Sequence, residues 1–473
     1  MTVQQLLDGI VASDNDAVVS GLTCDSRRVE PGYVFVCIEG TAVDGHRFAQ
    51  AAHDAGAALV VTQRPMGLER ELTLPSTRRA WAQLCANWFG NPASQLHLIG
   101  ITGTNGKTTM TYMLKAILEK AGHKVGLIGT IQNMVGDRIL PSGHTTPDPY
   151  DLQSMLSIML KEGCTYAVME VSSHALDQDR VEGCLFDAAV FTNLTQDHLD
   201  YHKTMENYCD AKKRLFKRAS RAIVNADDAW ADAITEGFEG DIFGFATRSQ
   251  DAAYRADNIV MRADGVTFDL LEHGVRIGTL SLPIPGRFSV YNAMASAVCA
   301  LSLGIPFETV KAALCGTCGV KGRAEVVPTD RDYTVVIDYA HTPDGLENIC
   351  RTLKDCATGR LIVLFGCGGD RDKTKRPRMA TIAAQYADYL VITSDNPRTE
   401  DPQAILQDIL VGVPEGCEHT VIENRRDAIA FALQSAKSGD TVLLAGKGHE
   451  TYQILKDGVI HFDEREVIAE ILK

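Results

Sequence analysis

The residues with the clearest chemical meaning form the segment Gly-Ile-Thr-Gly-Thr-Asn-Gly-Lys-Thr-Thr at positions 100–109. An apolar run typical of a buried strand precedes it, and apolar residues at helical spacing follow it. A glycine-rich turn at the start of a helix presents backbone N–H groups and the positive end of the helix dipole to a phosphate group. Lys107 adds a cation for a terminal phosphate, and Thr108 adds a hydroxyl group suited to Mg²⁺. The segment therefore predicts a site for a nucleoside triphosphate.

One position departs from the general phosphate-loop pattern. The pattern has a glycine five residues before Gly106, where this chain has Ile101, and Gly103 provides the turn instead. An ordinary loop before a core helix is the alternative, but the place of Gly-Lys-Thr between a strand pattern and a helix pattern favours the phosphate loop. The predicted nucleotide contacts in this segment are Gly103, Thr104, Asn105, Gly106, Lys107, Thr108 and Thr109.

Length, charge and cysteine content limit the class of protein. A chain of 473 residues is too long for one hydrophobic core and predicts two to four domains. The net charge of −15, from 46 basic and 61 acidic residues, argues against a nucleic-acid-binding surface. No apolar run is long enough to span a membrane and the first residues lack a signal-peptide pattern, so we expect a cytoplasmic protein without membrane insertion. The 13 cysteines lack metal-site spacing, and the single Cys-x-x-Cys, Cys315 with Cys318, is interpreted as two reduced thiols.

Alternating strand and helix signals divide the chain into three parts. Residues 1–87 predict a small N-terminal α/β domain. Residues 88–320 begin with the phosphate loop and predict a central domain with a parallel sheet and a small antiparallel annex near 254–282. Residues 321–473 alternate strands and helices regularly and predict a doubly wound α/β domain. The predicted fold class is therefore α/β with three domains.

Polar residues follow predicted strands of the central domain, where the ligands of a parallel sheet gather. Glu170 ends an apolar strand, where an acid is often a satisfied core group. Beside a phosphate loop it becomes a better candidate for Mg²⁺, which prefers oxygen ligands. His198 lies in the polar segment 197–202, and imidazole is more often a hydrogen-bonding group than a Mg²⁺ ligand. The residues alone leave the role of His198 open.

Polar clusters end four predicted strands of the third domain, at 338–341, 369–373, 395–398 and 446–450. One such end is unremarkable, but four in one domain predict a binding face. The glycines at 366, 368 and 369 begin like a dinucleotide fingerprint, but its sixth position is Arg371 instead of glycine. Nicotinamide binding is therefore excluded.

Seven motifs of this chain, in this order, together resemble the Mur ligase family, ATP-dependent amide-forming enzymes of peptidoglycan precursor synthesis. The motifs are Gly103–Thr109, Met169–His174, Phe191–Asn193, Asp197–His202, Gly322–Arg323, Asp338–Pro343 and Asp395–Arg398. The resemblance covers nearly the whole chain. It implies one domain for the UDP end of the substrate, a central ATPase domain and a Rossmann-like C-terminal domain that binds the incoming amino acid.

Within the family, the chain resembles members that add meso-2,6-diaminopimelate to the D-glutamate side chain of UDP-N-acetylmuramoyl-L-alanyl-D-glutamate. The resemblance implies that ATP first converts that carboxylate to an acyl phosphate, with two Mg²⁺ ions present, and that the amine then displaces phosphate. The residues that it implies for the UDP-muramoyl dipeptide are Cys24, Ser26, Thr41, Ala42, Val43, His144, Thr145, Thr146, Ser172, Gln178 and Arg180. The family usually has asparagine where this chain has His144.

The resemblance also implies a catalytic and metal-binding set. Its members are Lys107, Glu170, His198 and Lys212, with Thr108 as a further Mg²⁺ ligand. Lys212 matches a lysine that takes up CO₂ as a carbamate and holds the second Mg²⁺. On the residues alone, the neighbouring Lys213 and Arg214 favour a solvated basic helix face for Lys212 instead. The nucleotide contacts implied beyond the phosphate loop, across the central and C-terminal domains, are Asn292, Arg323, Asp338 and His341.

The residues implied for diaminopimelate are Arg371, Asp395, Asn396, Pro397, Arg398, Gly446 and Glu450. Diaminopimelate differs from lysine by one additional carboxylate, and Arg398 offers that group a planar, bidentate partner. Family members that add lysine lack this arginine, and Glu450 is expected to face the distal ammonium. We expect a monomer without a nucleic-acid partner.

Two kinds of alternative function remain. Another ligase of the same group would add lysine to the same precursor or glutamate to folate. Arg398 argues against lysine, while Ser172 and Arg180, with the other precursor-binding residue Gln178, argue against folate. A P-loop kinase or a regulatory nucleotide-binding module would explain the phosphate loop. Neither would explain the polar strand ends of a separate third domain.

Overall fold

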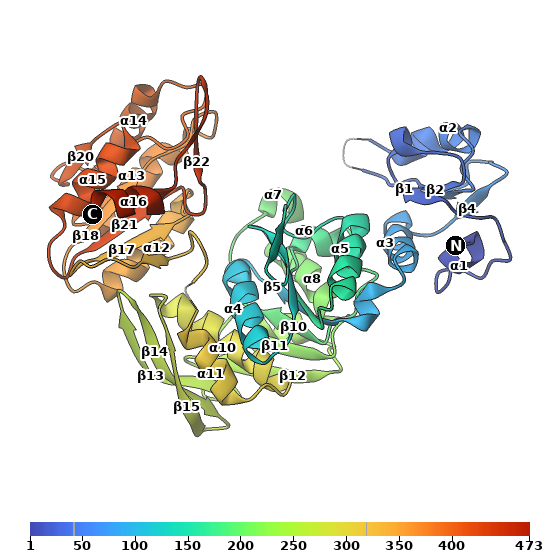
Figure 1. The fold of residues 1–473 in the computed structure, drawn as a ribbon, viewed down its shortest axis with the longest axis horizontal. Helices are drawn as coiled ribbons and strands as arrows, with labels where there is room; N and C mark the ends of the chain where they lie inside the picture. The colour runs from blue at the N-terminus through green and yellow to red at the C-terminus, as the bar shows by residue number, and fades with distance from the viewer. Residues whose placement is uncertain (41–42, 318) are drawn as a thin grey trace. The chain divides into compact units, whose positions relative to one another are not determined.

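The computed structural model describes residues 1–40, 43–317 and 319–473 (Figure 1). The chain divides into two compact units, each described below by itself. Unit 1 comprises Met1–Phe245 and Val298–Ile305, and unit 2 comprises Ala246–Ala297 and Pro306–Lys473. Thr41, Ala42 and Cys318, named above, lie outside the described residues. The domain boundaries expected near 87 and 320 stay predictions.

The first sheet of unit 1 is parallel and four-stranded, in the order β1-β2-β3-β4. Its strands are β1 (Gly21–Thr23), β2 (Tyr33–Val36), β3 (Leu59–Thr62) and β4 (Glu71–Thr73). The accompanying helices are α1 (Val3–Leu6), α2 (Ala49–Asp54) and α3 (Thr77–Trp88), with the 3₁₀ turns η1 (Ser26–Arg28) and η2 (Gly45–Phe48). Val34 and Val36 of β2 face one apolar cluster with Trp81, whereas Phe35 faces a second one with Val60. Both faces of the sheet are therefore covered, as a parallel sheet requires.

The second sheet of unit 1 follows the order β12-β11-β10-β5-β9-β6-β7-β8 and is parallel from β12 to β6. Its strands are β5 (His97–Thr102), β6 (Val125–Ile128), β7 (Asn133–Val135), β8 (Arg138–Leu140), β9 (Tyr166–Glu170), β10 (Ala188–Phe191), β11 (Arg221–Asn225) and β12 (Asp241–Ala246). The turns and helices of this part are η3 (Pro92–Gln95), α4 (Lys107–Lys120), α5 (Pro149–Lys161), α6 (Ser173–Asp177), α7 (Leu199–His202), α8 (Met205–Phe216) and α9 (Ala231–Thr235).

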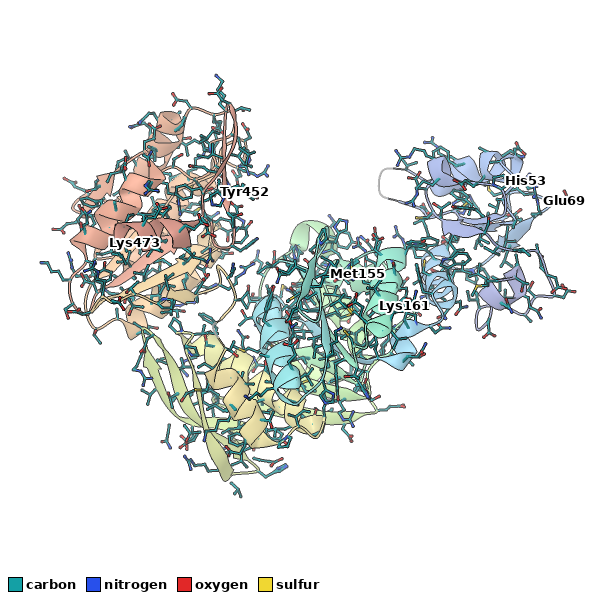
Figure 2. All side chains as sticks on the ribbon, in the orientation of Figure 1. His53, Glu69, Met155, Lys161, Tyr452 and Lys473 are labelled. Carbon is teal, nitrogen blue, oxygen red and sulfur yellow. The ribbon has the colours of Figure 1, made fainter. Side chains whose placement is uncertain are left out.

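The central strands of this sheet are buried on both faces. Every residue of β5 after His97 and every residue of β9 is buried. Met155 of α5, labelled in Figure 2, packs against the core that these strands share with α8. Because β5, β9 and β10 lie side by side and parallel, their carboxyl ends meet at one edge of the sheet.

Unit 2 begins with an antiparallel meander (Figure 1). Its strands are β13 (Tyr254–Arg262), β14 (Gly265–Glu272) and β15 (Val275–Leu282), followed by the helices α10 (Arg287–Ser302) and α11 (Phe307–Cys315). Helix α10 extends into the segment Val298–Ile305 of unit 1. The meander confirms the antiparallel annex expected near 254–282.

The main sheet of unit 2 has the order β16-β17-β21-β18-β19-β20, with all pairs parallel except β16 with β17. The strands are β16 (Glu325–Val327), β17 (Thr334–Asp338), β18 (Leu361–Phe365), β19 (Tyr389–Ile392), β20 (His419–Val421) and β21 (Thr441–Ala445). The helices are α12 (Pro343–Cys356), α13 (Lys375–Tyr386), α14 (Pro402–Leu410), α15 (Arg425–Ser435) and α16 (Glu464–Ile471). Strands alternate with helices as the sequence predicted, which confirms the α/β class.

A short antiparallel hairpin completes unit 2. It consists of β22 (Tyr452–Leu455) and β23 (Gly458–His461). Sequence analysis predicted no strands here, because every residue of β23 is exposed and the segment lacks a buried apolar face. The backbone N–H of Arg398 donates to Ile454 O (3.1 Å), so the hairpin borders the segment that follows β19.

Candidate functional site

The turn between β5 and α4 has the backbone that a phosphate loop requires. Gly103 has a φ of 145°, and a Cβ at this position would collide with Thr192 Oγ1. Gly106 caps the amino end of α4 with a φ of 87°, in the left-handed region. Glycine tolerates both conformations, whereas a side chain would strain them. The helix therefore begins at Lys107 with its first N–H groups directed out of the turn.

The end of β10 holds this turn from the side. Thr192 Oγ1 donates to Asn105 O (2.6 Å), and Asn193 Oδ1 accepts from Asn105 N (3.0 Å). The backbone of Thr104 also donates to Asn193 O (2.8 Å). Sequence analysis gave Thr192 and Asn193 no individual role, although both belong to a motif of the resemblance. Thr192 Oγ1 also lies within hydrogen-bond distance of the carbonyl oxygen of Thr102, the last residue of β5, which is 90 residues earlier in the sequence. The geometry of the loop therefore depends on the pairing of β5 with β10.

Two lysine amines share one carbonyl oxygen of the turn. Nζ of Lys107 and Nζ of Lys212 each lie 2.9 Å from Gly103 O. Lys212 is 1% exposed on α8. Burial, and then the charge of Lys107, hold the pKa of the Lys212 ammonium well below its usual value. The solvated helix face that the residues alone favoured is therefore wrong, because Lys212 points into the core at the phosphate loop.

An aromatic ring borders the buried amine. Nζ of Lys212 lies 4.4 Å from the ring centroid of Tyr208, and Tyr208 OH lies 3.3 Å from Thr104 Oγ1. Burial raises the pKa of Tyr208 to about 12, so its hydroxyl stays protonated near neutral pH. The ring of His198 lies 6.1 Å from that of Tyr208 and 4.8 Å from that of His174. Tyr208 and His174 were not among the predicted site residues.

Glu170 is buried at the end of β9 and faces the start of α4. Its Oε1 accepts from Thr108 Oγ1 (3.0 Å) and from Thr130 N (2.8 Å), and its Oε2 accepts from Thr130 Oγ1 (3.1 Å). The structure thus brings together the two oxygen donors that sequence analysis assigned to Mg²⁺. Among the described residues, no three His, Cys, Asp or Glu side chains form a metal-binding group. A cation here would therefore need oxygen from a hydroxyl group, a phosphate or water as well.

The residues predicted for the muramoyl dipeptide form one hydrogen-bonded cluster beside Glu170. Thr146 Oγ1 donates to Glu170 O (2.9 Å) and accepts from Ser172 N (3.0 Å). Arg180 donates to Thr146 O (2.9 Å) and to Gln178 Oε1 (2.9 Å). Thr145 joins the cluster through Thr130 Oγ1 (3.0 Å), whereas His144 is exposed. A polar cluster of this kind can bind a carboxylate and peptide groups.

A cavity of about 450 Å³ adjoins this cluster within unit 1. Its lining includes Cys24, Gln178 and Arg180 from the predicted set. Trp81 and Tyr150 also line it, with ring centroids 6.4 Å apart and nearly parallel planes. Neither aromatic residue was predicted as part of a site, because an aromatic side chain on an amphipathic helix also fits a core position. Flat aromatic walls with an arginine suit a nucleotide or sugar ligand.

Ser26 and Val43, also predicted for the uridine end, are among the described residues of unit 1. Ser26 begins the turn η1, which Asp25 caps by accepting from Arg27 N (3.0 Å). Val43 is 48% exposed. Ser26 and Val43 do not line the cavity described above.

In unit 2, three of the residues predicted for the nucleotide, Arg323, Asp338 and His341, lie at the end of β17. Asp338 accepts from Ala324 N (2.7 Å) and Ala340 N (2.8 Å). The guanidinium of Arg323 lies 5.2 Å from the ring centroid of Tyr339, and the ring of His341 lies 4.6 Å from the same ring. Asn292 is buried on α10.

The residues predicted for the amino acid lie at the carboxyl ends of β18, β19 and β21. Asn396 Nδ2 donates to Glu450 Oε2 (2.9 Å). Arg398, in the left-handed region with a φ of 55°, donates from Nη1 to Gly369 O (2.8 Å). A Cβ at Gly446 would lie 2.8 Å from Asp395 Oδ2, so the glycine admits that carboxylate. Three loops that are separate in the sequence therefore form one edge.

Arg371 and Pro397 complete the predicted set at this edge. Arg371 is exposed, and its Nη1 lies 3.4 Å from Asp370 O. Pro397 is buried, and its carbonyl group lies against Gly369. An exposed arginine beside Arg398 adds positive charge that suits a ligand carrying carboxylates.

Comparison with known proteins identifies the class. Three family models match: "Mur ligase family, catalytic domain" at residues 18–83, "Mur ligase middle domain" at 101–300 and "Mur ligase, glutamate ligase domain" at 322–448. The chain belongs to the Mur ligase family, and it is an enzyme of the ligase class.

Individual relatives are similar over the whole chain. UDP-N-acetylmuramoyl-L-alanyl-D-glutamate–2,6-diaminopimelate ligase of Caldanaerobacter subterraneus subsp. tengcongensis is 48% identical over 100% of this chain and 99% of that protein. The protein of the same name from Clostridium botulinum is 47% identical over 97% of this chain and 96% of that protein. A solved structure with that name is 33% identical, with a TM-score of 0.79 over 100% of this chain and 98% of the other.

A more distant structure shares the fold alone. It is UDP-N-acetylmuramoylalanyl-D-glutamyl-2,6-diaminopimelate–D-alanyl-D-alanyl ligase from Acinetobacter baumannii, 21% identical, with a TM-score of 0.62 over 99% of this chain and 98% of that one. The family assignment confirms the predicted fold class with its three domains.

No helix in the described part of the chain combines the length and apolar composition needed to cross a membrane.

Proposed function

We propose that this enzyme uses ATP to join meso-2,6-diaminopimelate to the D-glutamate side-chain carboxylate of UDP-N-acetylmuramoyl-L-alanyl-D-glutamate. Relatives named for this activity are 43–48% identical over nearly their whole length, which supports the proposal. The observation that carries it is the edge where Arg398, Asn396 and Glu450 meet, with a cation and an anion on neighbouring loops. Such a pair suits a substrate that has both a carboxylate and an ammonium group at its far end.

The reaction needs two steps, because a carboxylate and an ammonium do not condense in water. A carboxylate oxygen attacks the γ-phosphorus of ATP, ADP leaves, and an acyl phosphate forms. The neutral amine of diaminopimelate then attacks the acyl carbon, its proton is lost, and phosphate leaves. Lys107 and the first N–H groups of α4 stabilise the negative charge that spreads over the transferred phosphoryl group.

Two Mg²⁺ ions are proposed as cofactors. Thr108 and Glu170 would hold one through the two oxygen donors described above, and Lys212 as a carbamate would hold the second, with His198 as a further ligand. Bound Mg²⁺ neutralises phosphate charge during phosphoryl transfer. Glu170 suits this role because its carboxylate is buried and oriented by Thr130.

The state of Lys212 supports its proposed modification. A lowered pKa increases the fraction of Lys212 that is a neutral amine, and only the neutral amine attacks CO₂. The nitrogen–carbon bond forms, the nitrogen loses one proton, and the neutral amine becomes an anionic carbamate. The carbamate thereby avoids the charge repulsion that the ammonium form of Lys212 has with Lys107, with which it shares the oxygen of Gly103.

The substrate-binding residues are proposed as follows. Cys24, Ser26, Thr41, Ala42 and Val43 hold the uridine end, and Trp81 and Tyr150 form walls of the cavity beside it. The cluster around Thr146 and the position of His144 hold the muramoyl dipeptide. Asn292, Arg323, Asp338 and His341 contact the nucleotide, and the edge with Arg398 holds diaminopimelate. A cytoplasmic monomer remains the expectation.

Phosphate release separates this function from its rivals. Purified enzyme is incubated with ATP and Mg²⁺, and inorganic phosphate and ADP are measured with each substrate left out in turn. We expect phosphate only when both the UDP-muramoyl dipeptide and diaminopimelate are present. A kinase would form ADP without free phosphate, and a lysine-adding ligase would show the higher kcat/KM with lysine. Either result would contradict the proposal.

A further inference from the structure

Lys447 is a buried cation at the end of β21 to which sequence analysis assigned no role. Its side chain is 0% exposed, and it directly follows Gly446 of the amino-acid edge. Nζ of Lys447 lies 3.0 Å from Glu450 Oε2 and 3.2 Å from Asn396 Oδ1. A buried ammonium is costly unless it is paired and hydrogen-bonded. The partners of Lys447 are two residues proposed to contact diaminopimelate, so its position bears on that site.

Lys447 fixes the orientation of the Asn396 amide. The Oδ1 atom accepts from Lys447 Nζ and also from Ile454 N (3.0 Å), while Nδ2 donates to Glu450 Oε2 (2.9 Å). An amide with two donors on its oxygen and an acceptor on its nitrogen has only one satisfied orientation. Removing Lys447 would leave Ile454 N as the remaining one of these two donors to Asn396 Oδ1, so the amide would be held less firmly.

Glu450 receives both of its side-chain donors on the same oxygen. Lys447 Nζ and Asn396 Nδ2 both reach Oε2, which directs Oε1 away from these two donors. Tyr452, labelled in Figure 2, covers Lys447 with its ring centroid 5.7 Å from Nζ. Lys447 therefore contacts the hairpin through Tyr452 as well as the loops that follow β19 and β21.

A separate buried ion pair holds the strand ends. Arg425 and Glu464 are both 0% exposed and 2.8 Å apart. Arg425 donates to Ala445 O (2.9 Å) and to Ser394 O (3.3 Å), the carbonyl groups just before Gly446 and Asp395. The backbone around the amino-acid edge is therefore anchored without Lys447. We expect variants of Lys447 to fold.

We propose that Lys447 is a positioning residue for the incoming amino acid, orienting Asn396 and Glu450 so that Glu450 Oε1 receives the distal ammonium of diaminopimelate. The inference rests on the proposed function, since it takes Asn396 and Glu450 as part of the amino-acid site. Lys447 itself does not touch the substrate. Its effect is therefore expected on the binding of one substrate out of three.

The first test is Lys447→Met, which keeps an unbranched side chain of nearly the same length and removes its charge. We expect kcat/KM for diaminopimelate to fall about 10- to 100-fold, mainly through KM, because hydrogen bonds to a charged group are lost. The KM values for ATP and for the UDP-muramoyl dipeptide should change by less than about threefold. If Lys447→Met does not fold, Lys447→Gln, which keeps a donor and most of the volume, is measured in the same way.

A double variant distinguishes positioning from a merely structural role. The double variant Lys447→Met with Glu450→Gln should lose little more than Glu450→Gln alone, because both changes act on one contact. Full additivity of the two losses in kcat/KM for diaminopimelate would overturn the inference.

Arg360→Met is the matched control. Arg360 also forms an ion pair with a buried acid, Asp440 (2.7 Å), but at the opposite ends of β18 and β21. We expect it to leave KM for diaminopimelate unchanged, and an equal rise in this variant would show that Lys447 acts only through stability. If Glu450→Gln leaves that KM unchanged, the proposed amino-acid site itself is wrong. If Glu450→Gln raises it and Lys447→Met does not, only the inference about Lys447 fails.

Discussion

The phosphate loop of unit 1 and the amino-acid edge of unit 2 differ in the hydrogen-bond and ion-pair partners of their cationic side chains. At the loop, Lys107 and Lys212 donate to the same carbonyl oxygen, and within the described residues Lys212 forms no ion pair. In unit 2, Lys447 is paired with Glu450, and Arg425 is paired with Glu464.

The difference indicates two ways to recognise charged ligands. Two lysine side chains that donate to one carbonyl oxygen beside a helix amino terminus favour an added anion, whether phosphate or carbamate. Paired charges hold side chains in fixed positions and so favour one shape of substrate. The loop is therefore expected to govern whether chemistry occurs, and the edge to govern which amino acid is used.

Lys107→Ala should have the largest effect, because it removes the cation nearest the transferred phosphoryl group. We expect ligation to fall by about 10²- to 10³-fold or more at saturating ATP. The measurement is phosphate release at steady state, with folding checked by circular dichroism. Lys120→Ala, an exposed lysine in the last turn of the same helix, is the control and should keep its activity. Near-normal ligation by Lys107→Ala would contradict the importance of the loop.

Lys212→Ala should be the next most damaging change, because it removes the amine for which we propose modification by CO₂. We expect at least about a 100-fold loss of activity, partly restored by acetate or formate in the vacated space. Wild-type enzyme should also lose activity in CO₂-free buffer and regain it with bicarbonate. Lys213→Ala, next to it and paired with Glu236, should behave like wild type. An unmodified Lys212 in a high-resolution map of active enzyme would rule out the carbamate.

Arg398→Ala tests the edge and should act on one substrate. We expect kcat/KM for diaminopimelate to fall ten- to a few hundred-fold, since a charge-assisted pair contributes about 1.5–3 kcal/mol. Alanine keeps the Cβ at a φ of 55°, so the backbone strain is unchanged. Arg398→Lys should have a kcat/KM for diaminopimelate between those of wild type and Arg398→Ala, because lysine keeps the charge and loses the bidentate geometry. Full preference for diaminopimelate over lysine in Arg398→Ala would place the discriminating residue elsewhere.

The smallest effect concerns stability and needs no substrate. In CO₂-free buffer, the lowered pKa of Lys212 means that the unfolded chain binds the proton more tightly than the folded one. Lys212→Met should therefore be more stable than wild type near pH 7, with the difference shrinking as pH rises toward the ordinary lysine value of about 10.5. Denaturant melts at several pH values check this. A difference that does not vary between pH 7 and pH 10 would show that the buried amine is not destabilising.

Local patterns in the sequence were sufficient for the elements that carry both sites. The strand–glycine–lysine–helix order predicted β5, the loop and α4, because a phosphate loop depends on residues adjacent in the chain. The alternation in the last third predicted β17, β18, β19 and β21, since each strand contains an uninterrupted apolar run. Parallel pairing then places polar strand ends at one edge, which is why the residues around Asn396 were predicted as a group.

Tertiary structure alone decided the state of the buried charges. Lys212 looked solvated beside Lys213, yet it meets Gly103, 109 residues away, because α8 packs against β5. The hairpin β22–β23 lacks a buried apolar face, so no sequence pattern predicted it. Lys447 contacts Asn396, which is 51 residues away in the sequence, and only the folded chain shows this contact. Helix and strand periodicity is a short-range property that the sequence by itself determines. Burial and ion pairing depend on which distant segments meet, and only the folded chain specifies that.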